Sequence, residues 1–274
     1  MDAAKEETKT YIEEQVKNAA PRNLLDNSDF TNPVNQRGNR SYTAVGYTID
    51  RWLNYAEGLT VKLQDGYLEL INTTNHDVYF IQKLYSVLPV GKRITLAFGL
   101  QDGSKFSRTG VTGGSSACNM SLEGYSVYYN VASGWITFHM HANATVKLKW
   151  VALYEGEYTI DTLPEYQPKG YGAELAECQR YYIDVSGAHA YGVLTEVGTA
   201  EFVIPIPVSL RFPYPSFSFE GSLWAYKGNG GVTLLNVNGA VANSASIRFF
   251  CTAESAENSA IIIPDILCTV SADL

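Results

Sequence analysis

Short segments of alternating apolar and polar residues fill most of this chain. Residues 60–64 and 67–71 alternate clearly, and the pair Asp65-Gly66 separates them, a combination typical of a β-hairpin. Similar segments recur without intervening helices, which predicts antiparallel β-sandwiches. The expected strands are 60–64, 67–71, 78–84, 93–100, 126–131, 134–140 and 145–154 in a first series, and 192–195, 200–205, 216–220, 231–237, 245–251 and 266–272 in a second. The Gly-, Ser- and Thr-rich residues 102–116 are expected to form an exposed loop or a loose hairpin.

Residues 3–18 carry the one long helical pattern, and good helix formers dominate it. Its apolar stripe is narrow and consists of Ala4, Tyr11, Ile12, Val16 and Ala19. A helix of this length is marginal alone in water, so it needs a partner. We favour a short bundle that joins identical chains; the alternative is a helix that lies on its own domain.

A second, shorter helical pattern covers residues 170–182, after the break at Gly170 and Gly172. Leu175, Cys178 and Tyr182 share one helix face and should meet apolar surface, while Glu174 and Glu177 should remain in water. This segment divides the chain into two β-rich bodies. The expected divisions are an N-terminal helix (1–21), a first sandwich (22–168), a helical joint (169–185) and a second, small sandwich (186–274).

The composition narrows the function. The net charge of −8 argues against a nucleic-acid binder, which needs a basic surface. Apolar stretches have the length of strands, so no membrane insertion is expected. The N-terminus shows no signal-peptide pattern, which suggests synthesis in a cytoplasm without export by the usual route. Only 18% of residues are charged while 19 are tyrosines, a balance that suits strands and aromatic binding surfaces.

Patterns for catalysis and cofactors are weak, and we expect no enzyme, cofactor or metal. His139-x-His141 places two imidazoles on one strand face, but a stacked surface pair is favoured over a metal site because no third ligand is near in sequence. Glu155 and Glu157 flank a glycine at a strand end, and nothing places them as a catalytic pair. Asp50-Arg51-Trp52 is interpreted as structural. The four cysteines, Cys118, Cys178, Cys251 and Cys268, are scattered and are expected to be free, buried thiols.

Aromatic side chains are the best candidates for a binding site, because sugars stack on them. Trp224 and Tyr226 lie two residues apart beside the Gly-rich stretch 227–231. They are the main candidates for glycan binding, with a contact between subunits as an equal alternative. Tyr125, Tyr128 and Tyr129 form a second, weaker cluster. The other tryptophans, Trp52, Trp135 and Trp150, are expected in the core.

Three stretches resemble a known family in their order and spacing. Residues 174–182, Glu-Leu-Ala-Glu-Cys-Gln-Arg-Tyr-Tyr, resemble a joint common in bacteriophage and prophage tail-fibre-like proteins. Residues 23–30, followed by 35–38 and 47–52, look like the opening of the carbohydrate-binding-module-like jelly roll of such proteins, and 146–156 look like its last strand. The resemblance covers residues 22–185 and is loose beyond them.

This resemblance implies a non-enzymatic virion fibre or adhesin, made in the bacterial host cytoplasm and expected as a homotrimer. Its N-terminal helix would contact other virion proteins, and its β domains would face a host-surface glycan. Two alternatives remain open at this point. One is a purely structural virion component, such as a head fibre, collar or baseplate decoration; the other is a non-catalytic module of a glycan depolymerase.

Overall fold

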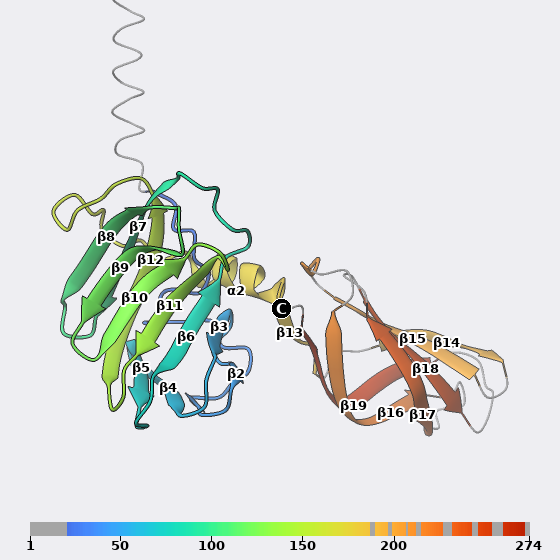
Figure 1. Cartoon of the computed structure of the whole chain (residues 1–274). Helices are drawn as coiled ribbons and strands as arrows, with labels where there is room; N and C mark the ends of the chain where they lie inside the picture. Colours follow the sequence, from blue (N-terminus) through green and yellow to red (C-terminus); the bar gives the residue numbers. More distant parts are fainter. Residues whose placement is uncertain are drawn as a thin grey trace, which may run out of the picture. The chain divides into compact units, whose positions relative to one another are not determined.

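The computed structural model describes residues 21–186, 190–196, 199–206, 208–211, 215–226, 232–242, 246–253 and 260–271, so the expected helix of residues 3–18 lies outside the described residues. The chain forms two compact units, residues 1–171 (unit 1) and 172–274 (unit 2). Figure 1 shows both as mainly β. The division falls within the expected helical joint.

Unit 1 consists of two six-stranded antiparallel sheets, in the orders β1-β4-β5-β12-β7-β8 (sheet A) and β2-β3-β6-β11-β10-β9 (sheet B). The strands of sheet A are β1 (Ser41–Tyr42), β4 (Leu59–Gln64), β5 (Tyr67–Asn72), β7 (Arg93–Leu100), β8 (Lys105–Val111) and β12 (Thr145–Glu155). Those of sheet B are β2 (Gly46–Tyr47), β3 (Trp52–Asn54), β6 (Val78–Lys83), β9 (Ser116–Leu122), β10 (Tyr125–Asn130) and β11 (Trp135–Met140). The mainly antiparallel β architecture predicted from the alternation is therefore confirmed for this unit.

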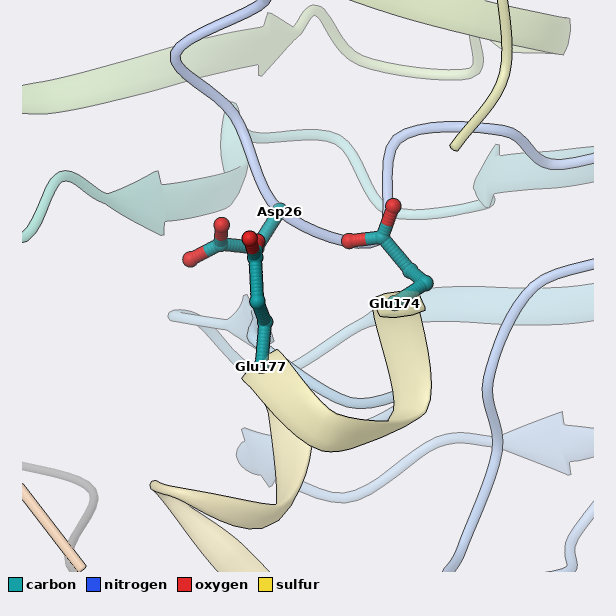
Figure 2. A group of neighbouring side chains, drawn as sticks. All are labelled: Asp26, Glu174 and Glu177. Carbon is teal, nitrogen blue, oxygen red and sulfur yellow. The ribbon is translucent and has the colours of Figure 1, made fainter. Parts of the chain in front are cut away.

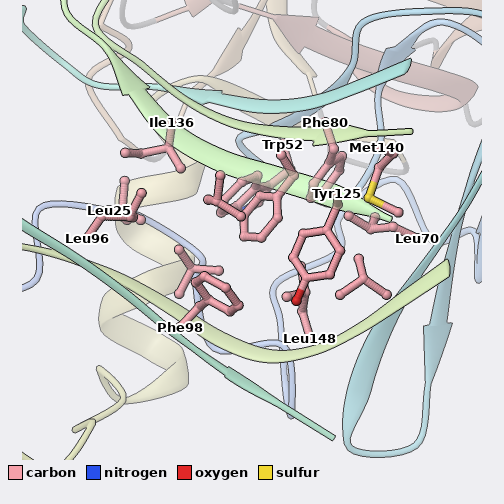
Figure 3. Packing of buried hydrophobic residues seen from close by; sticks show 14 of the residues in the cluster. Leu25, Trp52, Leu70, Phe80, Leu96, Phe98, Tyr125, Ile136, Met140 and Leu148 are labelled. Carbon is pink, nitrogen blue, oxygen red and sulfur yellow. The ribbon is translucent and has the colours of Figure 1, made fainter. Parts of the chain in front are cut away.

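The two sheets enclose one hydrophobic core, which Figure 3 shows from close by. Strand β10 illustrates how the sequence forms it. Tyr125, Val127 and Tyr129 are buried, while the residues between them are half-buried on the outer face, as the two-residue period of a strand requires. At the centre of the core the Trp52 ring stacks on Phe80, with ring centroids 4.9 Å apart.

The stretch expected as an exposed loop or loose hairpin contains a full strand. Strand β8 pairs with β7 along its length, from Lys105 beside Gly99 to Val111 beside Arg93. None of its residues is buried, so its apolar pattern is weak. The position of β8 therefore depends on its backbone hydrogen bonds to β7, which the local sequence of β8 does not predict.

Unit 2 contains one seven-stranded antiparallel sheet in the order β13-β19-β14-β15-β18-β17-β16. The strands are β13 (Tyr182–Asp184), β14 (Ala190–Glu196), β15 (Thr199–Pro205), β16 (Ser216–Tyr226), β17 (Val232–Ala242), β18 (Ser246–Ala253) and β19 (Ala260–Ser271). Strand β19 also pairs with β16, so the sheet closes on itself. The antiparallel β architecture predicted for this unit is therefore confirmed, with its strands joined in one closed sheet. The long β19 pairs with β13, β14 and β16, and closure leaves fewer unpaired strand edges.

Helix α2 (Tyr171–Gln179) confirms the short helical segment but corrects its orientation. Figure 2 shows Glu174 and Glu177, one turn apart on this helix. Glu174 is buried and Leu175 only half-buried. The buried residues are therefore Glu174 and Cys178 of the helix and Tyr181 just after it, so only Cys178 is shared with the expected apolar face. No helix within the described residues combines the length and apolar character needed to span a membrane.

All four cysteines are free and buried, as predicted. Burial raises the pKa of Cys118, Cys251 and Cys268 to about 11. A shift of this size lowers the thiolate fraction roughly a hundredfold below that of an ordinary thiol.

Slow alkylation of the folded protein is therefore expected. Iodoacetamide at pH 8, followed by mass spectrometry, should label the folded chain slowly, and all four thiols should react once the chain is unfolded. Rapid labelling of one cysteine in the folded chain would show that its site is open to solvent.

Candidate functional site

The outer face of sheet B carries a group of aromatic side chains that are not in the core. We call Tyr79 of β6, Tyr128 of β10, and Trp135 and His139 of β11 the aromatic face. All four side chains are half-buried, whereas the residues next to them along each strand are buried. They come from three adjacent strands, so the strand register brings them together.

The register sets the rows of this face. His139 lies between Ser126 of β10 and Tyr79 of β6, and Thr137 lies between Tyr128 and Ile81. Side chains at directly opposed positions are close enough to interact. Burial raises the pKa of Tyr128. The Tyr128 hydroxyl is therefore neutral at physiological pH.

Ring contacts order the same face. The Tyr79 and His139 rings stack with centroids 4.7 Å apart, and His139 meets His141 edge-on at 5.3 Å. Nε2 of His139 lies 2.7 Å from Oδ2 of Asp77. The two histidines are thus in contact as expected, but edge-on, and the ring stacked on His139 is that of Tyr79.

Trp135 completes the face at the other end of β11. Its ring packs edge-on against the exposed Tyr55, with centroids 5.4 Å apart. Its indole N–H is buried and has no hydrogen-bond partner among the described residues. Trp135 therefore contributes apolar, aromatic surface to this face.

A shallow depression of about 280 Å³ adjoins Tyr128 on the β9–β10 hairpin. Its lining residues are Ser116, Asn119, Met120, Ser121, Ser126, Val127 and Tyr128. Serine hydroxyls and the Asn119 amide offer donors and acceptors beside one aromatic ring. This is the combination that holds a polar ligand with hydrophobic C–H surfaces.

The outer face of sheet A differs, because the chain itself covers part of it. Residues following β12 fold back so that Tyr166 stacks on Trp150, with centroids 4.8 Å apart and planes inclined by 10°. Thr95 Oγ1 donates a hydrogen bond of 2.9 Å to the carbonyl oxygen of Gly156. Sheet B therefore provides the more accessible aromatic surface of unit 1.

The structure separates the tyrosines of the weaker cluster. Tyr125 is 6% exposed and Tyr129 0%, so both belong to the core and are corrected as glycan candidates. Figure 3 shows Tyr125 among the core side chains. The Tyr129 hydroxyl accepts a hydrogen bond from the backbone N–H of Leu88. Tyr128 alone faces outward.

The two main candidates for glycan binding, Trp224 and Tyr226, lie at the end of β16. Trp224 is paired with Leu234 of β17 and Ile263 of β19, whereas Tyr226 is paired with Val232 of β17. Their side chains and residues 227–231 lie outside the described part of the chain. The expectation of a binding site there stays a prediction.

Among the three tryptophans expected in the core, only Trp52 is fully buried. Trp135 and Trp150 are half-buried and cover opposite outer faces of unit 1. The sequence missed Trp135, Tyr79 and His139 as parts of one surface. The one signal in the sequence is that these residues alternate with the apolar core residues of β6 and β11, which places them on the outer face.

Charged side chains at strand ends form ion pairs. Lys92 Nζ lies 3.5 Å from a carboxylate oxygen of Glu155, and Arg93 forms an ion pair with Glu157. Asp50 is paired with Arg37, and Arg51 with Asp26, so Asp50 and Arg51 serve the fold as predicted.

No protein-family model matches this chain, and no curated protein matches it either.

Proposed function

We propose that this chain is a non-enzymatic fibre or adhesin protein of a bacteriophage virion, which attaches to a glycan on the host surface. The observation that carries the proposal is the aromatic face of sheet B beside a depression lined by hydroxyl and amide groups. Such a surface offers a ring for the C–H face of a sugar and polar groups for its hydroxyls. In this proposal unit 1 is the jelly roll of the tail-fibre resemblance.

Binding at this surface is shallow, so attachment depends on several copies. One aromatic stacking contact contributes about 0.5–1.5 kcal/mol beyond the buried area. Copies joined as a homotrimer, the expected assembly, multiply weak sites into firm adhesion. Because the chain has a net charge of −8, neutral glycans are favoured over polyanionic ones.

The aromatic face predicts a specific loss on mutation. Tyr128→Ala should weaken binding of the full chain to its best neutral glycan on an array by roughly twofold to tenfold, as expected for one stacking contact. Tyr67→Ala is the matched control, because Tyr67 is also half-buried but lies on β5 of sheet A. The control should bind as the unmodified chain does.

A third variant tests the alternative surface at the end of β16. If Trp224→Ala with Tyr226→Ala abolishes binding while Tyr128→Ala does not, unit 2 is the binding unit and the aromatic face is not the site. If the unmodified chain binds no glycan and virions lacking it adsorb normally, attachment is wrong and a structural virion role stands in its place.

A further inference from the structure

Three valines project from one end of unit 1. Val87 and Val90 belong to the loop between β6 and β7, and Val111 is the last residue of β8. Their exposed fractions are 51%, 81% and 50%. We call these three residues the valine end. Single exposed apolar residues are ordinary, but a group on one surface marks an interaction site.

Backbone hydrogen bonds hold the valines on a defined scaffold. The N–H of Gly91 donates to the carbonyl oxygen of Thr112 at 2.6 Å, which brings the residues after Val90 beside those after Val111. Earlier in the loop, the N–H of Leu88 donates to the Tyr129 hydroxyl at 3.1 Å. A loop fixed in this way loses little conformational entropy when a partner binds.

The loop also seats Val87 against the rest of unit 1. A Cβ at Gly134 would lie 3.2 Å from a Val87 methyl carbon, so the Val87 side chain borders the β10–β11 turn. Gly134 has φ +71°, which a glycine adopts without strain. The valine end therefore extends from that turn to the start of β7 in sheet A, where Arg93 pairs with Val111.

The occupant that fits best is a second copy of this chain. The N–H of Leu24 donates to the carbonyl oxygen of Leu153, two residues before β12 ends. Glu155, at that end, pairs with Ile94 of β7, so the first described residues of the chain lie toward the valine end. The sequence of residues 1–20 predicts a helix whose narrow apolar stripe needs a partner. Copies held together by that segment would meet at this end with a high effective concentration.

The charges at this end permit such an approach. Two chains of net charge −8 repel each other on average. Here, however, Lys92 is paired with Glu155 and Arg93 with Glu157, so cations balance anions around the valines. A locally balanced surface removes the repulsion that like-charged copies would otherwise feel.

From these observations we infer that the valine end is a contact surface between copies of this chain, which acts together with residues 1–20. The inference concerns assembly and holds whether or not the protein binds a glycan. Failure of the glycan experiment would leave it intact.

The test is the oligomeric state of the full chain by sedimentation velocity over a wide concentration range. Val87→Asp together with Val90→Asp should raise the dissociation constant by about tenfold to a hundredfold, because each change places a charge in the contact. Val45→Asp is the matched control. Val45 is 52% exposed and precedes β2, whose Gly46 pairs with Asn54 at the far end of β3. The control should associate as the unmodified chain does.

A second measurement does not depend on tolerance of aspartate. Val90→Cys should form a disulfide between copies under mild oxidation, while Val45→Cys should not; the four native thiols are buried. The inference is overturned if the unmodified chain is monomeric throughout. It is also overturned if Val90→Cys and Val45→Cys cross-link equally, or if the aspartate variants fold and associate normally.

Discussion

Trp52→Ala is expected to lower the free energy of unfolding of unit 1 by about 3–5 kcal/mol, the usual cost of emptying a buried tryptophan site. The Trp52 ring stacks on Phe80 at 4.9 Å and meets Phe30 edge-on at 5.3 Å. Its indole N–H donates a 2.8 Å hydrogen bond to the carbonyl oxygen of Asn27. Alanine removes all of these contacts and leaves a buried acceptor without its donor, which adds to the cavity cost.

The measurement is urea unfolding of the full chain followed by far-ultraviolet circular dichroism. Trp135→Ala serves as the control, because Trp135 is half-buried and its N–H makes no hydrogen bond to any residue that the structure describes. It should cost roughly 1–2 kcal/mol, in line with partial burial. Equal losses at the two positions would contradict the assignment of Trp52 as the centre of the core.

Much of the fold of unit 1 follows from alternation alone. The pattern at residues 60–64 and 67–71 anticipates β4 and β5 within a residue, because each strand has one core face and one outer face. Strand β8 does not show this alternation. It is not buried, and its position depends on pairing with β7, a contact that the local sequence does not encode.

Unit 2 and helix α2 show two further limits. Closure of the second sheet depends on β19 pairing with both β14 and β16, which is a matter of strand length and bending rather than of pattern. In α2 the hydrophobic pattern predicts that Leu175 is buried, yet Glu174 is buried and Leu175 is only half-buried. Tertiary context there overrides the hydrophobic ranking of adjacent residues, as it often overrides local preference.

The candidate site was predicted in part. The tyrosine cluster of β10 was found, but its members point to opposite sides of the sheet. The two-residue period already separates Tyr128 from Tyr125 and Tyr129, which share a face with the apolar Val127. The neighbours of Tyr128 on the outer face come from β6 and β11, and only the register between distant strands reveals them.

The second large effect is expected at Asp50, which is 1% exposed. Its carboxylate accepts hydrogen bonds from Arg37 at 2.9 Å, and from the backbone N–H and side-chain amide of Gln36 at 3.2 and 2.9 Å. Asp50→Ala should destabilise unit 1 by about 3 kcal/mol, because it breaks a buried ion pair and removes the carboxylate that accepts these hydrogen bonds. The loop before β1 should also become more sensitive to protease, since Asp50 fixes its backbone.

A surface pair of similar geometry provides the control for Asp50. Arg40 and Asp65 are also 2.9 Å apart, but their side chains are 67% and 100% exposed. Such pairs contribute little to stability, so Asp65→Ala should leave unfolding unchanged. Double-mutant cycles of Asp50 with Arg37, and of Asp65 with Arg40, isolate the two pair energies. We expect a clear coupling energy for the buried pair and none for the exposed one. Indistinguishable coupling energies would show that Asp50 stabilises the loop through Gln36 alone, and that its contact with Arg37 is dispensable.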